Sequence, residues 1–173
     1  MTLSDFLAAE QHSAVRHEFV YGKMIELPGG TIVHDNVIEN LNEILKAILK
    51  PKGYKTYAQG RMVKVPDGSI FYPDVVATNE QATQELFLEA PSLIAEVMSP
   101  SSRVYDNTDK FIAYRTIPQL QYYLLVKPEA PFATLLQRTP AGVWHGQDFT
   151  NQDALVELPD LGVSFSLGDL YGV

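Results

Sequence analysis

The sequence predicts an α/β (α+β) fold in which a central mixed β-sheet is flanked by helices. Three observations lead to this fold class. A long amphipathic segment after Gly30 carries apolar residues every three or four positions, which indicates a helix. Short apolar runs typical of strands lie on both sides of it, and a shorter helical segment separates two of them. No repeat, linker or low-complexity tract divides the 173 residues, so we expect one domain over residues 1–173.

The first third of the chain is expected to hold two helices and a hairpin. Ser4 is suited to cap a short helix that ends near Glu10. Residues 15–27 alternate like a strand pair with a turn at Gly22-Lys23. The long helix begins at Thr31 and ends near residues 50–53, where proline and glycine follow one another closely. Its predicted buried face consists of Val33, Val37, Leu41, Ile44, Leu45 and Ile48.

From residue 54 onward the pattern is mostly that of strands. Two strands are predicted at 54–65 and 70–77, with a turn at 66–69, followed by a loop or short irregular helix at 79–90. A core strand covers 93–98, and a helix capped by Asp106 or Asn107 runs to about Thr116. The remaining predicted strands lie at 121–126, 133–138 and 144–149, before an irregular end with short β pieces such as 163–165.

Composition and motifs exclude several classes of function. The chain has no cysteine, which excludes disulfides, cysteine-ligated zinc, iron–sulfur clusters and thiol nucleophiles. It has no G-x-x-x-x-G-K-[ST], G-x-G-x-x-G, H-E-x-x-H or G-x-S-x-G motif, so nucleotide-binding, zincin and α/β-hydrolase interpretations lack support. Residues 1–10 do not resemble a secretory signal, and no apolar run approaches the roughly 20 residues of a spanning helix. We expect a cytoplasmic protein without membrane contact.

The charge distribution permits two interpretations. The net charge of −8 and the pI of about 4.9 argue against a nucleic-acid-binding protein. However, six of the 13 basic residues lie between positions 46 and 64, without an acidic residue among them. This basic stripe either approaches a phosphate backbone or merely solubilises a helix end and a loop. Its members are Lys46, Lys50, Lys52, Lys55, Arg61 and Lys64.

Two carboxylates interrupt apolar runs that are predicted to be strands. Asp74 follows Pro73 in one run, and Glu96 lies inside the next. Burial of an unpaired charge costs roughly several kcal/mol, so each buried carboxylate needs a specific partner. If the two strands are neighbours, both carboxylates can share a divalent cation such as Mg²⁺, which prefers a few carboxylates plus waters. The alternative is that they cap turns or pair with Arg61 or Arg103.

Three further side chains are candidates for chemistry, each with a structural alternative. Lys110 shares a predicted helix face with Asp106 and Tyr114, and either forms an exposed salt bridge or acts as a cation on a phosphate. His34 lies in the first turn of the long helix and is either a capping or core histidine, or a site residue. Glu18 interrupts the hairpin and is either a third carboxylate or a solvent-facing residue.

The ordered segments resemble the "Putative restriction endonuclease" family of the PD-(D/E)XK nuclease superfamily. The resemblance spans roughly residues 15–145 and depends on the order and spacing of several segments. They are HEFVYGKMIELP (17–28), His34, YPDVV (72–76), PSLIAEVMSPSSRVYD (91–106), K-x-x-x-Y (110–114) and IPQLQYYLLVKP (117–128).

The resemblance implies a restriction-endonuclease-like fold and a Mg²⁺-dependent (or Mn²⁺-dependent) endonuclease that hydrolyses phosphodiester bonds in DNA. Asp74 and Glu96 would be the metal ligands. The superfamily's lysine would stand two residues after Glu96, where this chain has Met98, and its role would pass to Lys110 on the following helix. By the same resemblance, the residues that match the family's catalytic positions are Glu18, His34, Asp74, Glu96, Lys110 and Tyr114.

Several alternatives stay open. The missing in-strand lysine and the net charge favour a second hypothesis, a non-catalytic binding or regulatory domain that kept the nuclease fold. RNA or branched nucleic acid is a third possibility for the substrate. A homodimer is compatible with either function.

Overall fold

The computed structural model describes residues 1–81, 86–98 and 105–172. Of residues 105–107 only the backbone is described. The Arg103 partner considered above, and the Asp106 and Asn107 side chains considered as helix caps, therefore lie outside the described part of the chain. Among the described residues, no helix combines the length and the apolar character needed to cross a membrane.

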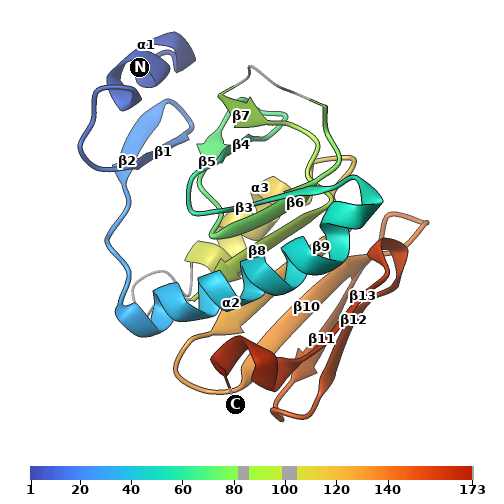
Figure 1. Cartoon of the computed structure of the whole chain (residues 1–173). Helices are drawn as coiled ribbons and strands as arrows, with labels where there is room; N and C mark the ends of the chain where they lie inside the picture. Colours follow the sequence, from blue (N-terminus) through green and yellow to red (C-terminus); the bar gives the residue numbers. More distant parts are fainter. Residues whose placement is uncertain (82–85, 99–104, 173) are drawn as a thin grey trace.

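A six-stranded mixed sheet forms the centre of the described structure, in the order β11-β10-β9-β8-β6-β3 (Figure 1). β8 and β9 are parallel, and the other neighbouring pairs are antiparallel. This sheet and its flanking helices confirm the predicted fold class. The strands are β3 (Lys55–Ala58), β6 (Val75–Thr78), β8 (Leu93–Val97), β9 (Tyr122–Lys127), β10 (Phe132–Arg138) and β11 (Trp144–Phe149).

A second, five-stranded sheet has the order β2-β1-β5-β4-β7. The predicted hairpin is present, but its turn is at Tyr21-Gly22, one residue before the predicted Gly22-Lys23. The N-terminal helix α1 (Leu3–Glu10) packs on this sheet, because the ring of Phe6 stacks on Phe19 with centroids 5.1 Å apart. The strands are β1 (His17–Val20), β2 (Lys23–Glu26), β4 (Met62–Lys64), β5 (Ile70–Phe71) and β7 (Phe87–Leu88).

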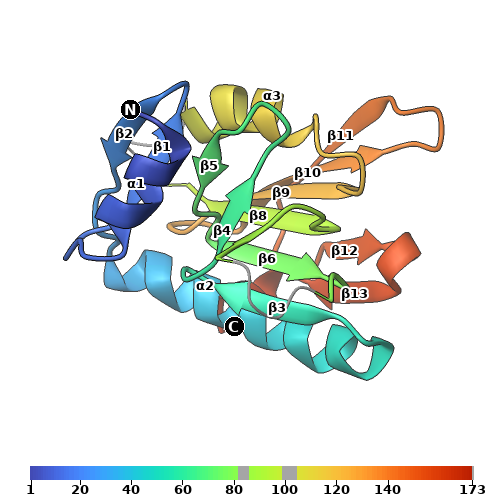
Figure 2. The ribbon, with the colours of Figure 1, turned by 90° about the horizontal axis from the view of Figure 1, so that it is seen from above.

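Helices lie on both faces of the central sheet (Figure 2). α2 (Ile32–Leu49) and the two-stranded ladder of β12 (Leu155–Leu158) and β13 (Val163–Ser166) share one apolar core with one face. The π-helical turn η2 (Tyr105–Lys110) leads into α3 (Phe111–Tyr114), which packs with the second sheet on the other face. Short 3₁₀ turns complete the chain at η1 (Lys50–Lys52), η3 (Pro159–Leu161) and η4 (Leu167–Tyr171).

Two strands that were predicted to be continuous are each divided between the two sheets. The segment 54–65 forms β3 and β4, separated at Gln59, whose φ of 48° turns the chain out of the extended conformation. The segment 70–77 forms β5 and β6, separated at residues 72–74, because Pro73 has no N–H with which to continue a ladder. Both segments therefore cross from one sheet to the other, and they do so side by side, since the Gln59 N–H donates to the Asp74 carbonyl at 2.8 Å.

The helices differ from the prediction in three details. Thr2, not Ser4, caps α1, because its hydroxyl and Asp5 form a reciprocal capping box. Val33 is 51% exposed, and the buried side chains of α2 are Val37, Ile38, Leu41, Leu45 and Leu49. The short helix begins as a π-helical turn and ends at Tyr114, before the expected Thr116.

Candidate active site

Asp74 and Glu96 lie at matching positions of neighbouring strands. β6 and β8 pair antiparallel, with Val75 opposite Ala95, so the next step of this register places Asp74 opposite Glu96. Glu96 is inside β8, as predicted, whereas Asp74 lies on the bend before β6 and not inside a strand. There the Asp74 side chain takes the place of a backbone carbonyl as acceptor, because the Val97 N–H donates to Asp74 Oδ2 at 2.8 Å. The crossing of the two sheets therefore fixes both carboxylates at one place.

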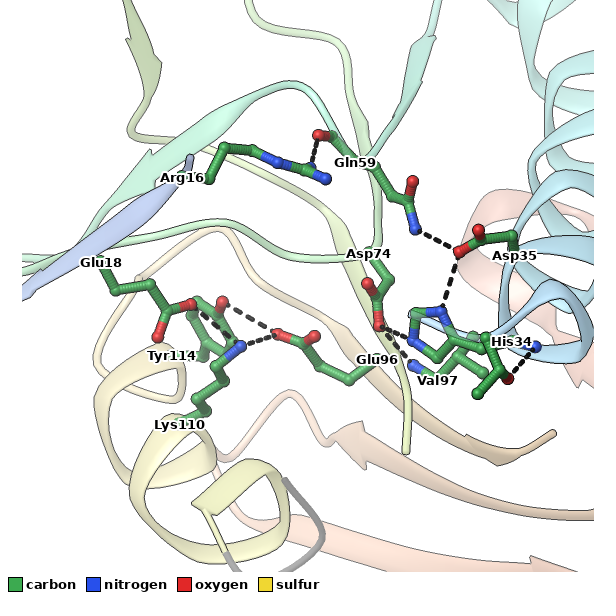
Figure 3. A network of polar contacts seen from close by, with 11 residues as sticks. Arg16, Glu18, His34, Asp35, Gln59, Asp74, Glu96, Val97, Lys110 and Tyr114 are labelled. Atoms are coloured by element: carbon green, nitrogen blue, oxygen red, sulfur yellow. Dashed lines mark hydrogen bonds and ion pairs between the residues drawn. The ribbon is translucent and has the colours of Figure 1, made fainter. Parts of the chain in front are cut away.

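An open cleft of about 330 Å³ lies at this crossing. Of the six predicted site residues, Asp74, Glu96, Lys110 and His34 line it. Glu18 and Tyr114 are fully buried and contact Lys110 and Glu96, respectively, away from the lining. The structure thus gathers all six residues around one cleft (Figure 3).

Four of these residues form a buried group, here called the lysine cluster: Glu18, Glu96, Lys110 and Tyr114. The Lys110 ammonium bridges two carboxylates, with Nζ 3.0 Å from Glu18 Oε1 and 3.2 Å from Glu96 Oε1. The exposed fraction is 0% for Glu18, 2% for Glu96 and 4% for Lys110. Lys110 is therefore not the exposed helix salt bridge that was its structural alternative. A charge buried to this extent requires close partners, which fixes the ammonium between the two strands.

Tyr114 fixes the position of the Glu96 carboxylate by a hydrogen bond. Its hydroxyl donates to Glu96 Oε1 at 3.1 Å. Burial of the ring, reinforced by the negative charges of Glu96 and Glu18, raises the pKa of Tyr114 well above its usual value. The phenol is therefore protonated at neutral pH and serves as a hydrogen-bond donor. Glu18 is fixed in a similar way, since the Tyr72 N–H donates to its Oε1 at 3.2 Å.

Asp74 belongs to a second, more accessible group, here called the histidine cluster: His34, Asp35, Gln59 and Asp74. His34 Nε2 lies 3.6 Å from Asp74 Oδ2, and Nδ1 lies 3.2 Å from Asp35 Oδ1. The contact with Asp74, assisted by Asp35 and opposed by burial, raises the pKa of His34 from 6.5 to about 9. At pH 7 the imidazole is consequently charged. The Gln59 amide donates to Asp35 Oδ1 at 3.2 Å and completes the cluster.

The local sequence explains how His34 reaches the cleft. Thr31 caps α2, and its hydroxyl accepts from the His34 N–H at 3.2 Å, which places His34 in the first turn. The loop before the cap lies against this side chain. A Cβ on Gly30 would come within 2.6 Å of His34 Nδ1, so any larger residue there would require the imidazole to shift.

The donor set fits a hydrated divalent cation. Asp74 and Glu96 offer carboxylate oxygens, the donors that Mg²⁺ and Mn²⁺ prefer. Both contacts of the Asp74 carboxylate with other described residues use Oδ2. In the described ranges 1–81, 86–98 and 105–172, no three His, Asp or Glu side chains are arranged to hold an ion together. The set is thus a pair of carboxylates, and Mg²⁺ is commonly bound by one or two of these with waters.

Four residues at the site were not anticipated from the sequence: Arg16, Asp35, Gln59 and Tyr72. Arg16 and Gln59 line the cleft, where an Arg16 N–H donates to the Gln59 carbonyl. The Tyr72 hydroxyl donates to Glu10 Oε1 at 3.1 Å, and burial raises the pKa of Tyr72 to about 12. The position of Tyr72 directly before Pro73-Asp74 was an available signal. The remaining three are polar residues in turns or on helix surfaces, and no periodicity marks them.

The basic stripe lies away from this cleft for the most part. Its first members occupy the C-terminal end of α2, whereas His34 lies in the first turn; the 18 residues of this helix span about 27 Å. Lys52 donates to the carbonyls of Leu161 and Gly162, which indicates a structural role. Lys64 pairs with Glu89 at 2.8 Å. These two lysines are engaged within the fold and are not arranged around Asp74.

Comparison with known proteins places the chain in a family. The family model "Uma2: Putative restriction endonuclease" matches residues 3–168. Two uncharacterized proteins of Synechocystis sp. (strain ATCC 27184 / PCC 6803 / Kazusa) are related: sll1609 is 32% identical over 73% of this chain and 74% of its own length. The other, slr1290, is 28% identical over 96% of this chain and 89% of its own length.

A solved structure supports the fold independently. The crystal structure of "a putative nuclease belonging to DUF820" from Anabaena variabilis ATCC 29413 matches with a TM-score of 0.82 and 19% sequence identity. The match covers 99% of this chain and 98% of that chain, so the two share the whole fold. Because the family model spans nearly the full chain, this protein belongs to the Uma2 family described as "Putative restriction endonuclease".

Proposed function

We propose that this protein is a metal-dependent endonuclease that hydrolyses phosphodiester bonds in DNA. One observation carries the proposal: Asp74, Glu96 and Lys110 line the same cleft, although they come from the bend before β6, from β8 and from η2. Two carboxylates beside an ammonium are suited to phosphoryl chemistry, where charge develops on the phosphate oxygens. Membership of the Uma2 family supports the same reaction class.

In this proposal Asp74 and Glu96 hold Mg²⁺ or Mn²⁺. When bound, the ion supplies positive charge for a phosphate oxygen and lowers the pKa of water. Lys110 lies 3.2 Å from Glu96, where its ammonium can orient the attacking water or stabilise the developing negative charge. The other residues position these three groups.

The positioning roles follow from the contacts. Glu18 holds Lys110 Nζ at 3.0 Å, and Tyr114 holds Glu96 by its hydroxyl. The contact with His34 Nε2 and the hydrogen bond from the Val97 N–H hold the Asp74 carboxylate at the end of β8. Removal of such outer partners from metal sites costs about 10- to 100-fold in affinity or activity, and a metal ligand itself is expected to contribute at least as much.

The test is cleavage of supercoiled plasmid DNA with Mg²⁺, Mn²⁺ or EDTA. We expect cleavage by the wild type with either metal, and a loss of about 100-fold or more in Asp74→Asn and Glu96→Gln. Asp153→Asn, which changes an exposed carboxylate in the C-terminal part, is the matched control and should retain activity. Equal cleavage by all four proteins would indicate a contaminating nuclease and contradict the proposal. RNA and branched DNA should be assayed in parallel.

One observation favours a second candidate function, a non-catalytic binding or regulatory domain. Cations of the chain itself already contact both carboxylates, Lys110 on Glu96 and His34 on Asp74. Such a site is stable without a metal. Calorimetric titration with Mg²⁺ and Mn²⁺ separates the two functions. Binding that disappears in Asp74→Asn supports the nuclease, whereas no binding at millimolar metal supports the non-catalytic domain.

A further inference from the structure

A second groove, of about 360 Å³, lies between the β1–β2 hairpin, β5 and the helix formed by η2 and α3. It shares no lining residue with the candidate active site among the described residues. Its lining includes the buried Phe71 and the half-buried Val20, together with the exposed Tyr21, Ile25 and Ile112. We call this surface the hairpin face.

Tyr21 is an unexpected residue at its position. It has φ of 48° and Gly22 has φ of 78°, so the hairpin turn needs two left-handed residues, for which Asn-Gly is strongly preferred. A tyrosine is unfavourable there, since bulky residues rarely adopt positive φ. Its side chain is also 78% exposed, so packing within the chain does not compensate. Such an outlier points to a role for the side chain outside its own fold.

The groove is bordered by two opposite charges. Lys23 on the hairpin and Asp109 in η2 both line it. No ion pair within 4 Å involves either of them in the part of the chain that the structure describes. The hairpin face thus combines a projecting aromatic ring, an apolar groove, one cation and one anion.

We infer that the hairpin face binds the same face of a second copy of this chain, related by a two-fold axis. In a two-fold interface each residue pair occurs twice, so one surface must carry both complementary parts. Tyr21 of each copy would fill the groove of the other, and Lys23 of each would pair with Asp109 of the other. A chain of net charge −8 repels its own copies at long range, so contact requires this kind of local complementarity.

A nucleobase of the substrate is a less suitable occupant. Asp109 would repel the phosphates of a bound strand, and the groove walls are mostly apolar, as in the central part of a protein–protein interface. A second copy also accounts for Tyr21, which lines the groove and is 78% exposed, so most of its ring is available to a partner. The inference does not depend on the proposed nuclease activity.

The experiment is sedimentation velocity without metal or DNA, over about 1–200 µM, the range suited to a weak interface. The wild type should show a reversible monomer–dimer equilibrium. Tyr21→Asn should raise the dimer dissociation constant at least about tenfold, the change that the loss of one good contact produces. It should also raise the melting temperature of the monomer, because asparagine suits the turn. A purely structural role of Tyr21 would instead lower it.

Charge reversal provides the specific test. Lys23→Asp and Asp109→Lys should each weaken the dimer, and the double variant should restore it, since both cross-pairs reappear. Val143→Ser, which alters a 55% exposed side chain in the β10–β11 turn, is the control and should leave the dimer unchanged. A monomer at every concentration, or a dimer that Tyr21→Asn does not weaken, would overturn the inference. A third outcome would also overturn it. If the protein is a monomer, and if Glu96→Gln binds single-stranded DNA but the double variant Glu96→Gln/Tyr21→Asn does not, the groove takes a nucleobase and not a second copy.

Discussion

The lysine cluster and the histidine cluster carry similar charges in different surroundings. The side chains of Glu18, Glu96 and Lys110 are at most 6% exposed. In the histidine cluster, the exposed fraction of the side chain rises from 12% for His34 to 18% for Asp74 and 52% for Asp35. Water can partly replace a lost partner in the second cluster but not in the first. Substitutions in the lysine cluster should therefore have the larger effect on the free energy of unfolding, whereas substitutions in the histidine cluster should mainly change the charge and position of groups in the cleft.

The largest expected effect is that of Lys110→Met. The substitution removes the ammonium that bridges two buried carboxylates, and removal of one partner from such a pair costs about 3–5 kcal/mol. Lys64→Met is the matched control, because Lys64 pairs with Glu89 at 2.8 Å with side chains 27% and 58% exposed. We expect a loss below about 1 kcal/mol there. Urea unfolding measures both, and equal losses would contradict the comparison.

Tyr114→Phe should have the next largest effect. It removes the hydrogen bond that Tyr114 donates to Glu96 and keeps the ring, so the loss is that of a hydrogen bond to a charged group, about 1.5–3 kcal/mol. Tyr54→Phe is the control, since the hydroxyl of this half-buried tyrosine makes no hydrogen bond to a described residue. It should change the free energy of unfolding by less than about 0.5 kcal/mol. A similar loss in both variants would mean that Tyr114 does not support Glu96.

The two clusters also differ in how well the sequence predicts them. A carboxylate within an apolar run marks Glu96 and Asp74, and the period of α2 marks the helix that carries His34. The partnership of Lys110 with Glu18 joins residues 92 positions apart, from 110 to 18, and no local pattern encodes it. Glu18 therefore could not be distinguished from a solvent-facing residue, although it is 0% exposed.

The strand divisions at Gln59 and Pro73 escape prediction for a related reason. The apolar residues on either side of each break are buried or half-buried, so the hydrophobic pattern runs on although the chain changes sheets. Only the ladder partners reveal the change: Tyr57 pairs with Val76 in one sheet and Val63 with Phe71 in the other. The site lies at these breaks. The position of the site therefore depends on pairing between distant segments of the chain, and the hydrophobic periodicity of the sequence does not reveal this pairing.

His34→Gln should give a pH-dependent effect on stability. The folded pKa of about 9 exceeds the value of 6.5 expected when unfolded, so the charged imidazole stabilises the fold fully below pH 6.5. This contribution disappears as the pH rises through 9. We expect the wild type to exceed the variant by about 1–2 kcal/mol at pH 6, a figure reduced for partial exposure, and to match it above pH 10. Urea unfolding in EDTA measures the difference; a constant difference across this range would contradict the charge assignment.

Gly30→Ala should give the smallest effect on stability and still separate the clusters. A Cβ at Gly30 would meet His34 Nδ1 at 2.6 Å and Asp35 Oδ1 at 2.8 Å, whereas one at Gly29 would meet nothing within 4 Å. Both contacts are ends of side chains that can move, so the expected loss stays below about 1 kcal/mol. The displaced imidazole should lose part of its contact with the carboxylates, and its pKa, followed by NMR, should fall from about 9 toward 6.5. Gly29→Ala should leave this pKa unchanged. An unchanged value in both variants would show that the loop, not the histidine, gives way, and would contradict this prediction.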